Sequence, residues 1–142
     1  MNTYNKKKRP IRIAEPLKIN TIDKEKIKAD NYPVFCFKYL SDISIKKCTD
    51  PKFFYDFLMR LQKLSALGWA EIRKSHRHAY GLEPIPLYKI RPQVLPDSIT
   101  PDVKHLHAFR AGGNNLPFLG IQLNNIFRIL FIEANFGDIY EH

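Results

Sequence analysis

Long hydrophobic runs and paired cysteines are missing from the sequence, and both absences narrow what the protein can be. No segment approaches the roughly 18 consecutive apolar residues that a membrane-spanning helix needs, and the polar N-terminal residues lack the apolar stretch of a secretory signal peptide. The two cysteines, Cys36 and Cys48, form no CxxC motif. We therefore expect a cytoplasmic protein with both thiols reduced.

The motifs of the common enzyme classes are also absent. The sequence contains no GxxxxGK[ST] phosphate-binding loop, no GxGxxG after a strand, no GxSxG and no HExxH. Neither cysteine lies near a histidine in the sequence, so thiol catalysis has little support. No cofactor is predicted.

Aromatic residues and positive charge are what the chain has in excess. Seven Tyr, ten Phe and a hydrophobic fraction of 44% supply enough apolar surface for one buried core in a chain of 142 residues. Lysine and arginine total 23 against 14 acids, so the formal net charge is +9. Such an excess favours a polyanionic partner, namely nucleic acid, an acidic protein or an anionic membrane surface. The alternative is a basic protein with no such partner.

Residues 1–30 differ from the rest of the chain. They contain nine lysines and arginines against four acids, a net charge of +5, and Pro10 and Pro16 interrupt them. These features predict a flexible basic arm, which either contacts phosphates or is a solvated tail. Residues 31–142 are predicted to form the single folded domain.

The first half of this domain is predicted to contain one strand and two helices. Residues 34–40 are rich in β-forming side chains and predict a strand in the interior of a sheet. Asp50 as the cap, Pro51 in the first turn and Gly68 as the end delimit a helix, and residues 69–74 predict a second, shorter helix. The apolar side chains of the first helix repeat at spacings of three and four residues, which assigns them to the core: Phe53, Phe54, Phe57, Leu58, Leu61, Leu64 and Leu67.

The second half is predicted to be a proline-rich connector followed by strands. Five prolines within residues 84–101 forbid a helix and leave at most short edge pairing. Residues 105–110, 117–123 and 126–132 predict an antiparallel meander whose third strand is central, and the Asn124-Asn125 pair predicts a tight turn. The predicted fold class is therefore α+β, with an N-terminal strand and a helical pair packed on a mostly antiparallel sheet of about four strands.

Four histidines fall in two H-x-H pairs, His76/His78 and His105/His107, and residues two apart on a strand share a face. The first pair lies in a basic stretch, residues 73–80. Metal-independent RNA cleavage requires a base for the 2′-hydroxyl, an acid for the leaving oxygen and cations for the phosphorane. The candidate residues are the acid and base groups His76, His78 and Tyr80 and the phosphate-binding cations Lys74, Arg77, Arg110 and Arg128.

Two other interpretations of these residues stay open. The H-x-H pairs could bind zinc through neutral imidazoles, but the acids at short spacing are only Glu71, Glu83 and Asp102, and we predict no metal. A single histidine on a strand is also more often a surface residue than a catalyst. In the same way, one interpretation of Tyr140 and His142 is that they are simply exposed at the chain end.

The C-terminal residues resemble a known family. Phe109-Arg110, then residues 118–121, then residues 125–132 are similar in pattern to the strands of the RelE/HigB-like toxins of bacterial toxin–antitoxin systems, and the layout of residues 34–142 is similar to theirs. The resemblance implies an mRNA endonuclease that acts on free or ribosome-bound RNA without a metal and is held inactive by an antitoxin protein. It implies phosphate-binding roles for Arg110 and Arg128, and RNA-binding roles for the terminal groups Tyr140 and His142. The basic arm and the proline-rich connector depart from the family's pattern.

The leading hypothesis is thus a RelE-like, metal-independent RNA endonuclease whose partners are RNA and an antitoxin, and not a membrane. The rival is a non-catalytic nucleic-acid-binding or inhibitory module that uses the basic arm and the basic face of the sheet. The nuclease hypothesis requires imidazoles, guanidiniums and a phenol from separate stretches to converge on one solvent-reachable, positively charged surface.

Overall fold

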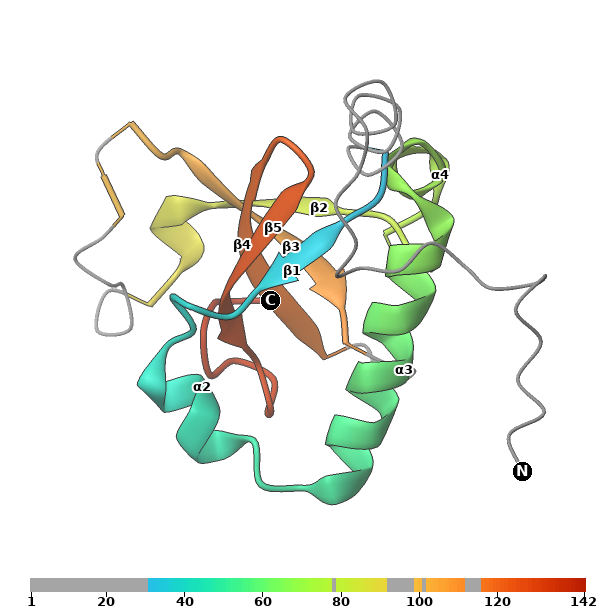
Figure 1. Cartoon of the computed structure of the whole chain (residues 1–142). Coiled ribbons are helices and arrows are strands. Elements are labelled where there is room, and N and C mark those ends of the chain that lie inside the picture. The colour runs from blue at the N-terminus through green and yellow to red at the C-terminus, as the bar shows by residue number, and fades with distance from the viewer. Residues whose placement is uncertain (1–30, 78, 92–98, 101, 112–115) are drawn as a thin grey trace, which may run out of the picture.

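The computed structural model describes residues 31–77, 79–91, 99–100, 102–111 and 116–142 (Figure 1). This part of the chain has the predicted α+β fold, with a mixed sheet of five strands in place of the four expected. The predicted arm, His78, part of the proline-rich connector and the predicted turn at residues 112–115 lie outside the described residues. The elements, in chain order, are β1 (Val34–Cys36), α2 (Asp42–Lys47), α3 (Pro51–Leu67), α4 (Trp69–Lys74), β2 (Glu83–Pro86), the 3-10 helix η2 (Leu87–Lys89), β3 (His105–Arg110), β4 (Pro117–Leu123) and β5 (Ile126–Ile132).

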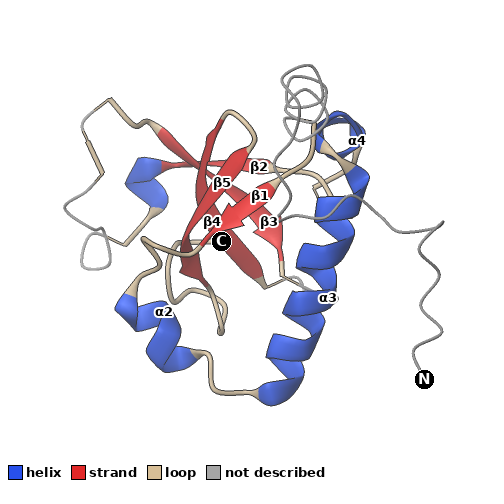
Figure 2. Ribbon diagram, in the orientation of Figure 1, coloured by secondary structure: helices blue, strands red, loops and turns tan. Residues whose placement is uncertain are grey.

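The strands lie in the order β1-β5-β4-β3-β2 (Figure 2). β3, β4 and β5 form the predicted antiparallel meander, and Asn124 adopts a φ of 57° in the tight turn between β4 and β5. β1 pairs with β5 in parallel, and β2 adds a short antiparallel strand beside β3. β5 therefore has a neighbour on each side, which agrees with its nearly continuous apolar sequence.

The structure corrects the prediction for the first strand. β1 covers three residues and lies at an edge of the sheet, whereas the sequence predicts an interior strand over residues 34–40. The chain turns after Cys36, and the Leu40 amide donates a hydrogen bond to the Phe37 carbonyl. Within β1, Phe35 is the residue that packs against the aromatic core. A run of β-forming side chains thus indicated a strand without indicating how many neighbours it has.

Helix α3 begins and ends where the sequence predicts. The Asp50 carboxylate accepts a hydrogen bond from the Lys52 amide, Pro51 occupies the first turn, and Gly68 follows the helix with a φ of 84°. The predicted core positions Phe54 and Leu58 are wrong, because their side chains are 43% and 68% exposed. The apolar positions cover more of the helix circumference than the one side that faces the sheet. The five other predicted positions are buried or pack partly buried against the core: Phe53, Phe57, Leu61, Leu64 and Leu67.

Helix α4 and an aromatic cluster join α3 to the sheet. The Trp69 indole is buried and donates a hydrogen bond of 3.2 Å to the Asn125 carbonyl in the β4–β5 turn. Phe109 contacts Phe118 and Phe127 with ring centroids 5.2 and 4.9 Å apart, so one aromatic side chain from each of β3, β4 and β5 meets the helices. Figure 1 shows α3 lying along this face of the sheet.

The sequence reasoning missed helix α2. The Ser41 side chain caps it by accepting from the Ile43 amide, and the buried hydroxyl of Ser44 accepts from the Ile132 amide at the end of β5. Six residues are too few to show a helical period, so no apolar repeat predicts this helix.

The second face of the sheet is covered by the connector and the C-terminal residues instead of a long helix. Pro84 and Pro86 lie in the edge strand β2, so the described part of the connector makes the short edge pairing that the sequence allows. Among the helices of the described segments, none is both long and apolar enough to cross a bilayer. The buried residues of this face come from five segments and include Ile85, Ile90, Leu106, Leu119, Leu130, Ile139 and Tyr140.

A prediction concerns Gly120, which lies at an irregularity in the β4–β5 pairing. A Cβ added there would overlap the carbonyl of Arg128 on the neighbouring strand, and backbone cannot move away as a side chain can. We expect Gly120→Ala to lower the free energy of unfolding by roughly 3 kcal/mol or more. Denaturant unfolding measures this. Leu123→Ala on the exposed end of β4 is the control, and an equal loss in both variants would contradict the steric explanation.

Candidate functional site

One cavity gathers four of the predicted site residues. It has a volume of about 300 Å³ and lies where β2, the end of β3 and the C-terminal residues meet. We call it the Glu83 pocket. Its polar lining residues come from stretches far apart in the sequence and are Arg77, Glu83, Lys89, Arg110, Tyr140, Glu141 and His142.

The Glu83 carboxylate binds two arginines at once. Its Oε1 lies 2.8 Å from Nη1 of Arg77, and its Oε2 lies 2.8 Å from Nη2 of Arg110. The side chain of Arg110 is only 8% exposed and so needs an anionic partner, since burying an unpaired cation is costly. The side chain of Arg77 is 56% exposed, so it reaches the solvent at the mouth of the pocket. Two of the three predicted arginines, Arg77 and Arg110, therefore do meet, but around a carboxylate that offsets part of their charge.

A fully buried carboxylate, Glu133, holds the C-terminal residues in place. Its Oε2 accepts hydrogen bonds from the amides of Ile139 and Tyr140, at 3.0 and 3.3 Å, and its Oε1 contacts Nε2 of His142. The His142 ring also packs against Tyr140, with centroids 4.2 Å apart, and against Phe136. A carboxylate on one nitrogen orients an imidazole and fixes which nitrogen faces the solvent. His142 is thus a positioned imidazole with a side chain 29% exposed, and not a loose terminal residue.

Tyr140 is buried rather than exposed, and its surroundings act on its proton. Burial raises the pKa of the Tyr140 hydroxyl above its ordinary value, and the carboxylates of Glu133 and Glu83 act in the same direction. Arg110, which hydrogen-bonds with the Tyr140 side chain, opposes them and lowers the pKa. The net direction is upward, so the phenol keeps its proton at neutral pH.

Three predicted residues from the basic stretch lie outside the pocket lining. Lys74 is exposed on α4, with its Nζ 4.0 Å from Glu71. His76 is exposed, and its backbone carbonyl accepts the amides of two residues in the following turn. Tyr80 packs against α3, where the guanidinium of Arg60 lies 4.8 Å from its ring. The predicted acid and base roles of His76 and Tyr80 therefore gain no support, and His78 lies outside the described residues.

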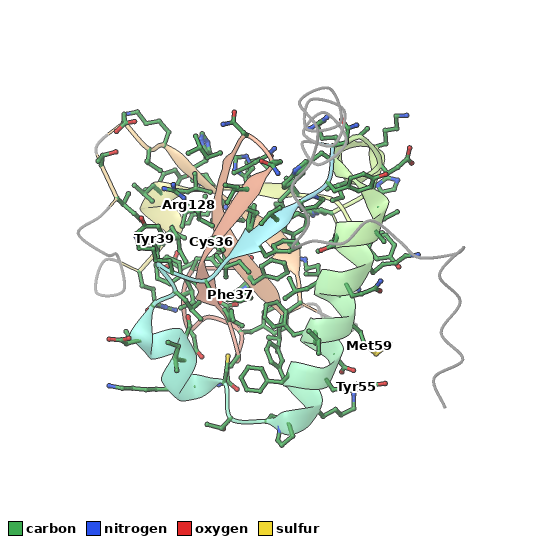
Figure 3. All side chains as sticks on the ribbon, in the orientation of Figure 1. Cys36, Phe37, Tyr39, Tyr55, Met59 and Arg128 are labelled. Atoms are coloured by element: carbon green, nitrogen blue, oxygen red, sulfur yellow. The ribbon has the colours of Figure 1, made fainter. Side chains whose placement is uncertain are left out.

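Arg128 is also far from the pocket. Arg110 pairs with Pro117 on β4, whereas Arg128 pairs with Ile121 on the other side of that strand. Pro117 and Ile121 are four residues apart on β4, which is roughly 13 Å along an extended strand, and the two arginines also lie on strands on opposite sides of β4. The two strand arginines, predicted to share phosphate binding, do not converge. Arg128 instead lies beside Tyr39, with its Cζ 5.3 Å from the ring (Figure 3).

The second H-x-H pair lies on β3, as predicted. Burial lowers the pKa of His107, and the nearby His105 lowers it further. Cys36 and Cys48 are both free thiols, and burial raises the pKa of Cys48. Within the residues that the structure describes, no three His, Cys, Asp or Glu side chains are grouped as a metal would require.

The pocket depends on two carboxylates that the sequence reasoning did not select. Glu133 follows directly on the apolar run of β5, and Glu83 precedes the prolines of β2. A lone acid beside a buried strand is a usable signal, since a carboxylate in such a place must find donors. No family model, curated protein or solved structure matches the chain.

A second prediction concerns Glu133. Glu133→Gln replaces one carboxylate oxygen by an amide donor, which must face either the backbone amides of the tail or the His142 ring. We expect a loss of about 1–3 kcal/mol in the free energy of unfolding and faster hydrogen exchange at residues 134–142. Glu141→Gln, on the exposed neighbour, is the matched control. Unchanged exchange in Glu133→Gln would show that the carboxylate does not hold the tail.

A third prediction concerns acid sensitivity. The pKa of His107 is lower in the folded state than in the unfolded state, so the folded state binds fewer protons at this site. The resulting stability is present above the ordinary histidine pKa of about 6.5 and is lost as the pH falls below it. We expect His107→Gln to lose less stability than the parent between neutral and mildly acidic pH, measured by denaturant unfolding. The exposed His76→Gln should behave like the parent, and parallel curves for all three proteins would contradict the prediction.

Proposed function

We propose that the protein is a RelE-like endoribonuclease that cleaves RNA in the Glu83 pocket by acid–base catalysis without a metal. The observation that carries the proposal is the assembly, in one cavity, of a carboxylate-held imidazole, a protonated phenol and two guanidiniums from three separate stretches of the chain. These are the groups that phosphodiester cleavage through the ribose 2′-hydroxyl needs.

The proposed roles follow from the surroundings of each side chain. His142, oriented by Glu133, takes the proton of the 2′-hydroxyl, and the 2′-oxygen forms a bond to the adjacent phosphorus. The bond from phosphorus to the 5′-oxygen breaks, and that oxygen receives a proton from Tyr140. The products are a 2′,3′-cyclic phosphate and a 5′-hydroxyl. Tyr140 can take the acid role because its phenol is protonated at neutral pH and lies in the lining of the pocket.

The two arginines differ in what they can offer the phosphate. Arg77 is largely exposed, so its guanidinium can bind a phosphate oxygen while Glu83 keeps its own hold on the buried Arg110. Glu83 then acts as a fixed anchor that orients both guanidiniums and limits the positive charge of the empty pocket. Neutralising it should therefore strengthen binding of uncleaved RNA while loosening the arrangement needed for cleavage.

One observation favours the non-catalytic rival. Basic side chains that lie outside the pocket reach the surface on α3 and α4, and two of them, the half-buried Arg60 and the exposed Lys63, lie over the ring of Tyr80. Cations beside an aromatic ring can bind single-stranded nucleic acid without cutting it. An RNA-binding module would use this surface together with the basic arm. The family resemblance adds the ribosome and an antitoxin protein as proposed partners of the nuclease.

A fourth prediction tests the two functions together. The purified chain, in the presence of a chelator, should cut single-stranded RNA, free or on translating ribosomes, and leave 2′,3′-cyclic phosphate ends. His142→Gln and Arg77→Gln should each slow cleavage by about 10²-fold or more. Their matched controls are His76→Gln and Arg73→Gln, an exposed histidine and an exposed arginine outside the pocket, which should cut at the parent rate. A substrate with a 2′-deoxyribose at the cleaved position should resist.

Three outcomes would contradict the nuclease. They are intact RNA under all conditions, cleavage that survives in His142→Gln, and equal losses in the pocket variants and their controls. RNA binding without cleavage, weakened by Arg60→Gln and Lys63→Gln but not by Arg77→Gln, would instead support the binding module. Its affinity should fall steeply with salt.

A further inference from the structure

The two edges of the sheet are built differently. In β2, Pro84 and Pro86 lack the amide hydrogen that a further strand would need, so this edge is protected against pairing. β1 at the opposite edge contains no proline, and no other strand of the described chain pairs with its outer side. The Val34 amide donates a hydrogen bond to the Asn125 carbonyl immediately before β5, so the backbone groups of Val34 face β5. Because successive residues of a strand point their backbone groups to alternate sides, those of Phe35 face the outer side.

Large apolar side chains are exposed along and beside this edge. Four of them fall within eight residues of sequence, and each is at least 39% exposed: Tyr32, Val34, Phe37 and Tyr39. β1 is short and lies between Pro33 and Lys38, which limits its pairing, but a monomeric protein does not normally surround such an edge with exposed aromatic groups. The β1 edge therefore has the composition of an interface.

Two cations lie beside the same edge without an acidic partner among the residues described. Nζ of Lys38 and Cζ of Arg128 are each 5.3 Å from the ring of Tyr39, and no carboxylate of the described residues forms a salt bridge with either. Figure 3 shows Tyr39, Arg128 and Cys36 close together next to β1. Beside them is a cavity of about 320 Å³, which Tyr39 and Arg128 line together with aliphatic side chains of the connector, β4 and β5: Ile99, Ile121, Leu123 and Leu130.

We propose that the β1 edge and this cavity form a docking site for an extended acidic segment of a partner protein. Such a segment would add a sixth strand by pairing with the outer side of β1. It would place an acidic side chain against Lys38 and Arg128 and an apolar side chain against the cavity. The backbone pairing supplies affinity for any strand, and the two cations select an acidic one. This inference does not depend on the Glu83 pocket.

The charges argue against the other occupants of such an edge. In a second copy paired edge to edge, Lys38 and Arg128 would approach their own equivalents, which repel. Among the described residues, RNA would meet exposed Val34 and Phe37 beside two cations, whereas an RNA surface needs a row of cations to follow the phosphates. An acidic peptide satisfies the apolar surface, the free backbone groups and both cations.

The test uses the full chain and short fluorescein-labelled peptides, with binding followed by anisotropy. A peptide of alternating glutamate and valine should bind with a sub-millimolar dissociation constant. Its counterpart of alternating lysine and valine should bind at least about tenfold more weakly. A version of the acidic peptide with N-methylated backbone amides should lose binding, because it cannot pair with the edge. Failure of the acidic peptide to bind at millimolar concentration, or equal binding of the methylated version, overturns the proposal.

Variants on the protein locate the site. Lys38→Glu should weaken binding of the acidic peptide by about tenfold or more and strengthen binding of the lysine peptide. The matched charge reversal Lys46→Glu on α2 should leave the binding of both peptides unchanged. Unchanged binding in Lys38→Glu overturns the proposal. Sedimentation tests whether the β1 edge instead pairs with a second copy of the chain. If the protein is a dimer and Phe37→Glu makes it a monomer, this edge binds itself and the proposal is overturned. Competition by RNA that Lys38→Glu abolishes would assign the surface to nucleic acid instead.

Discussion

The arrangement of the candidate site rests on the carboxylate of Glu133. It is fully buried at the end of β5 and collects the amides of Ile139 and Tyr140 and the ring of His142. A buried anion of this kind is tolerated only when donors satisfy its oxygens. The same donors fix the path of the last residues of the chain. The hydrogen bonds that stabilise the buried Glu133 carboxylate are therefore the ones that position Tyr140 and His142.

A second carboxylate, Glu83, does the corresponding work on the other side of the pocket. It keeps the guanidiniums of Arg77 and Arg110 together, and through Arg110 it reaches the hydroxyl of Tyr140. The two halves meet at Tyr140, whose backbone binds Glu133 and whose side chain contacts Arg110. Sites in which each polar group is held by another are preorganised and require little rearrangement when an anion enters. They also tolerate few substitutions, since removing one member leaves the others without partners.

Local patterns in the sequence predicted most of the fold but only half of the site. The caps of α3, the meander of β3 to β5 and the Asn124 turn follow from nearest neighbours along the chain, and the structure has all of them. The edge position of β1 and the exposure of Leu58 depend on what packs across from them, which a single sequence does not state.

The same distinction applies to the site. Cationic residue types pointed to Arg77 and Arg110, and the family resemblance of the C-terminal residues added Tyr140 and His142; these four side chains do share a pocket. The choice of His76 and Tyr80 rested on closeness in sequence to Arg77, and a turn directs these neighbouring side chains to different surfaces. The sequence pattern pointed to Glu83 only as an acid near the H-x-H pairs and did not point to Glu133, because an acid in a basic chain looks like a solvated surface charge until its donors are seen.

The parallel pairing of β1 with β5 also bears on how the chain folds as it is made. Val34 pairs with Ile126, so the side of β1 that faces β5 has no partner strand until β5 has been synthesised. The ribosome adds roughly 5–20 residues per second, and about 90 residues separate the two partners, so this edge stays open for several seconds of synthesis. During that interval nascent β1 and the apolar side of α3 are available to chaperones, and the sheet closes only when translation of β5 is complete.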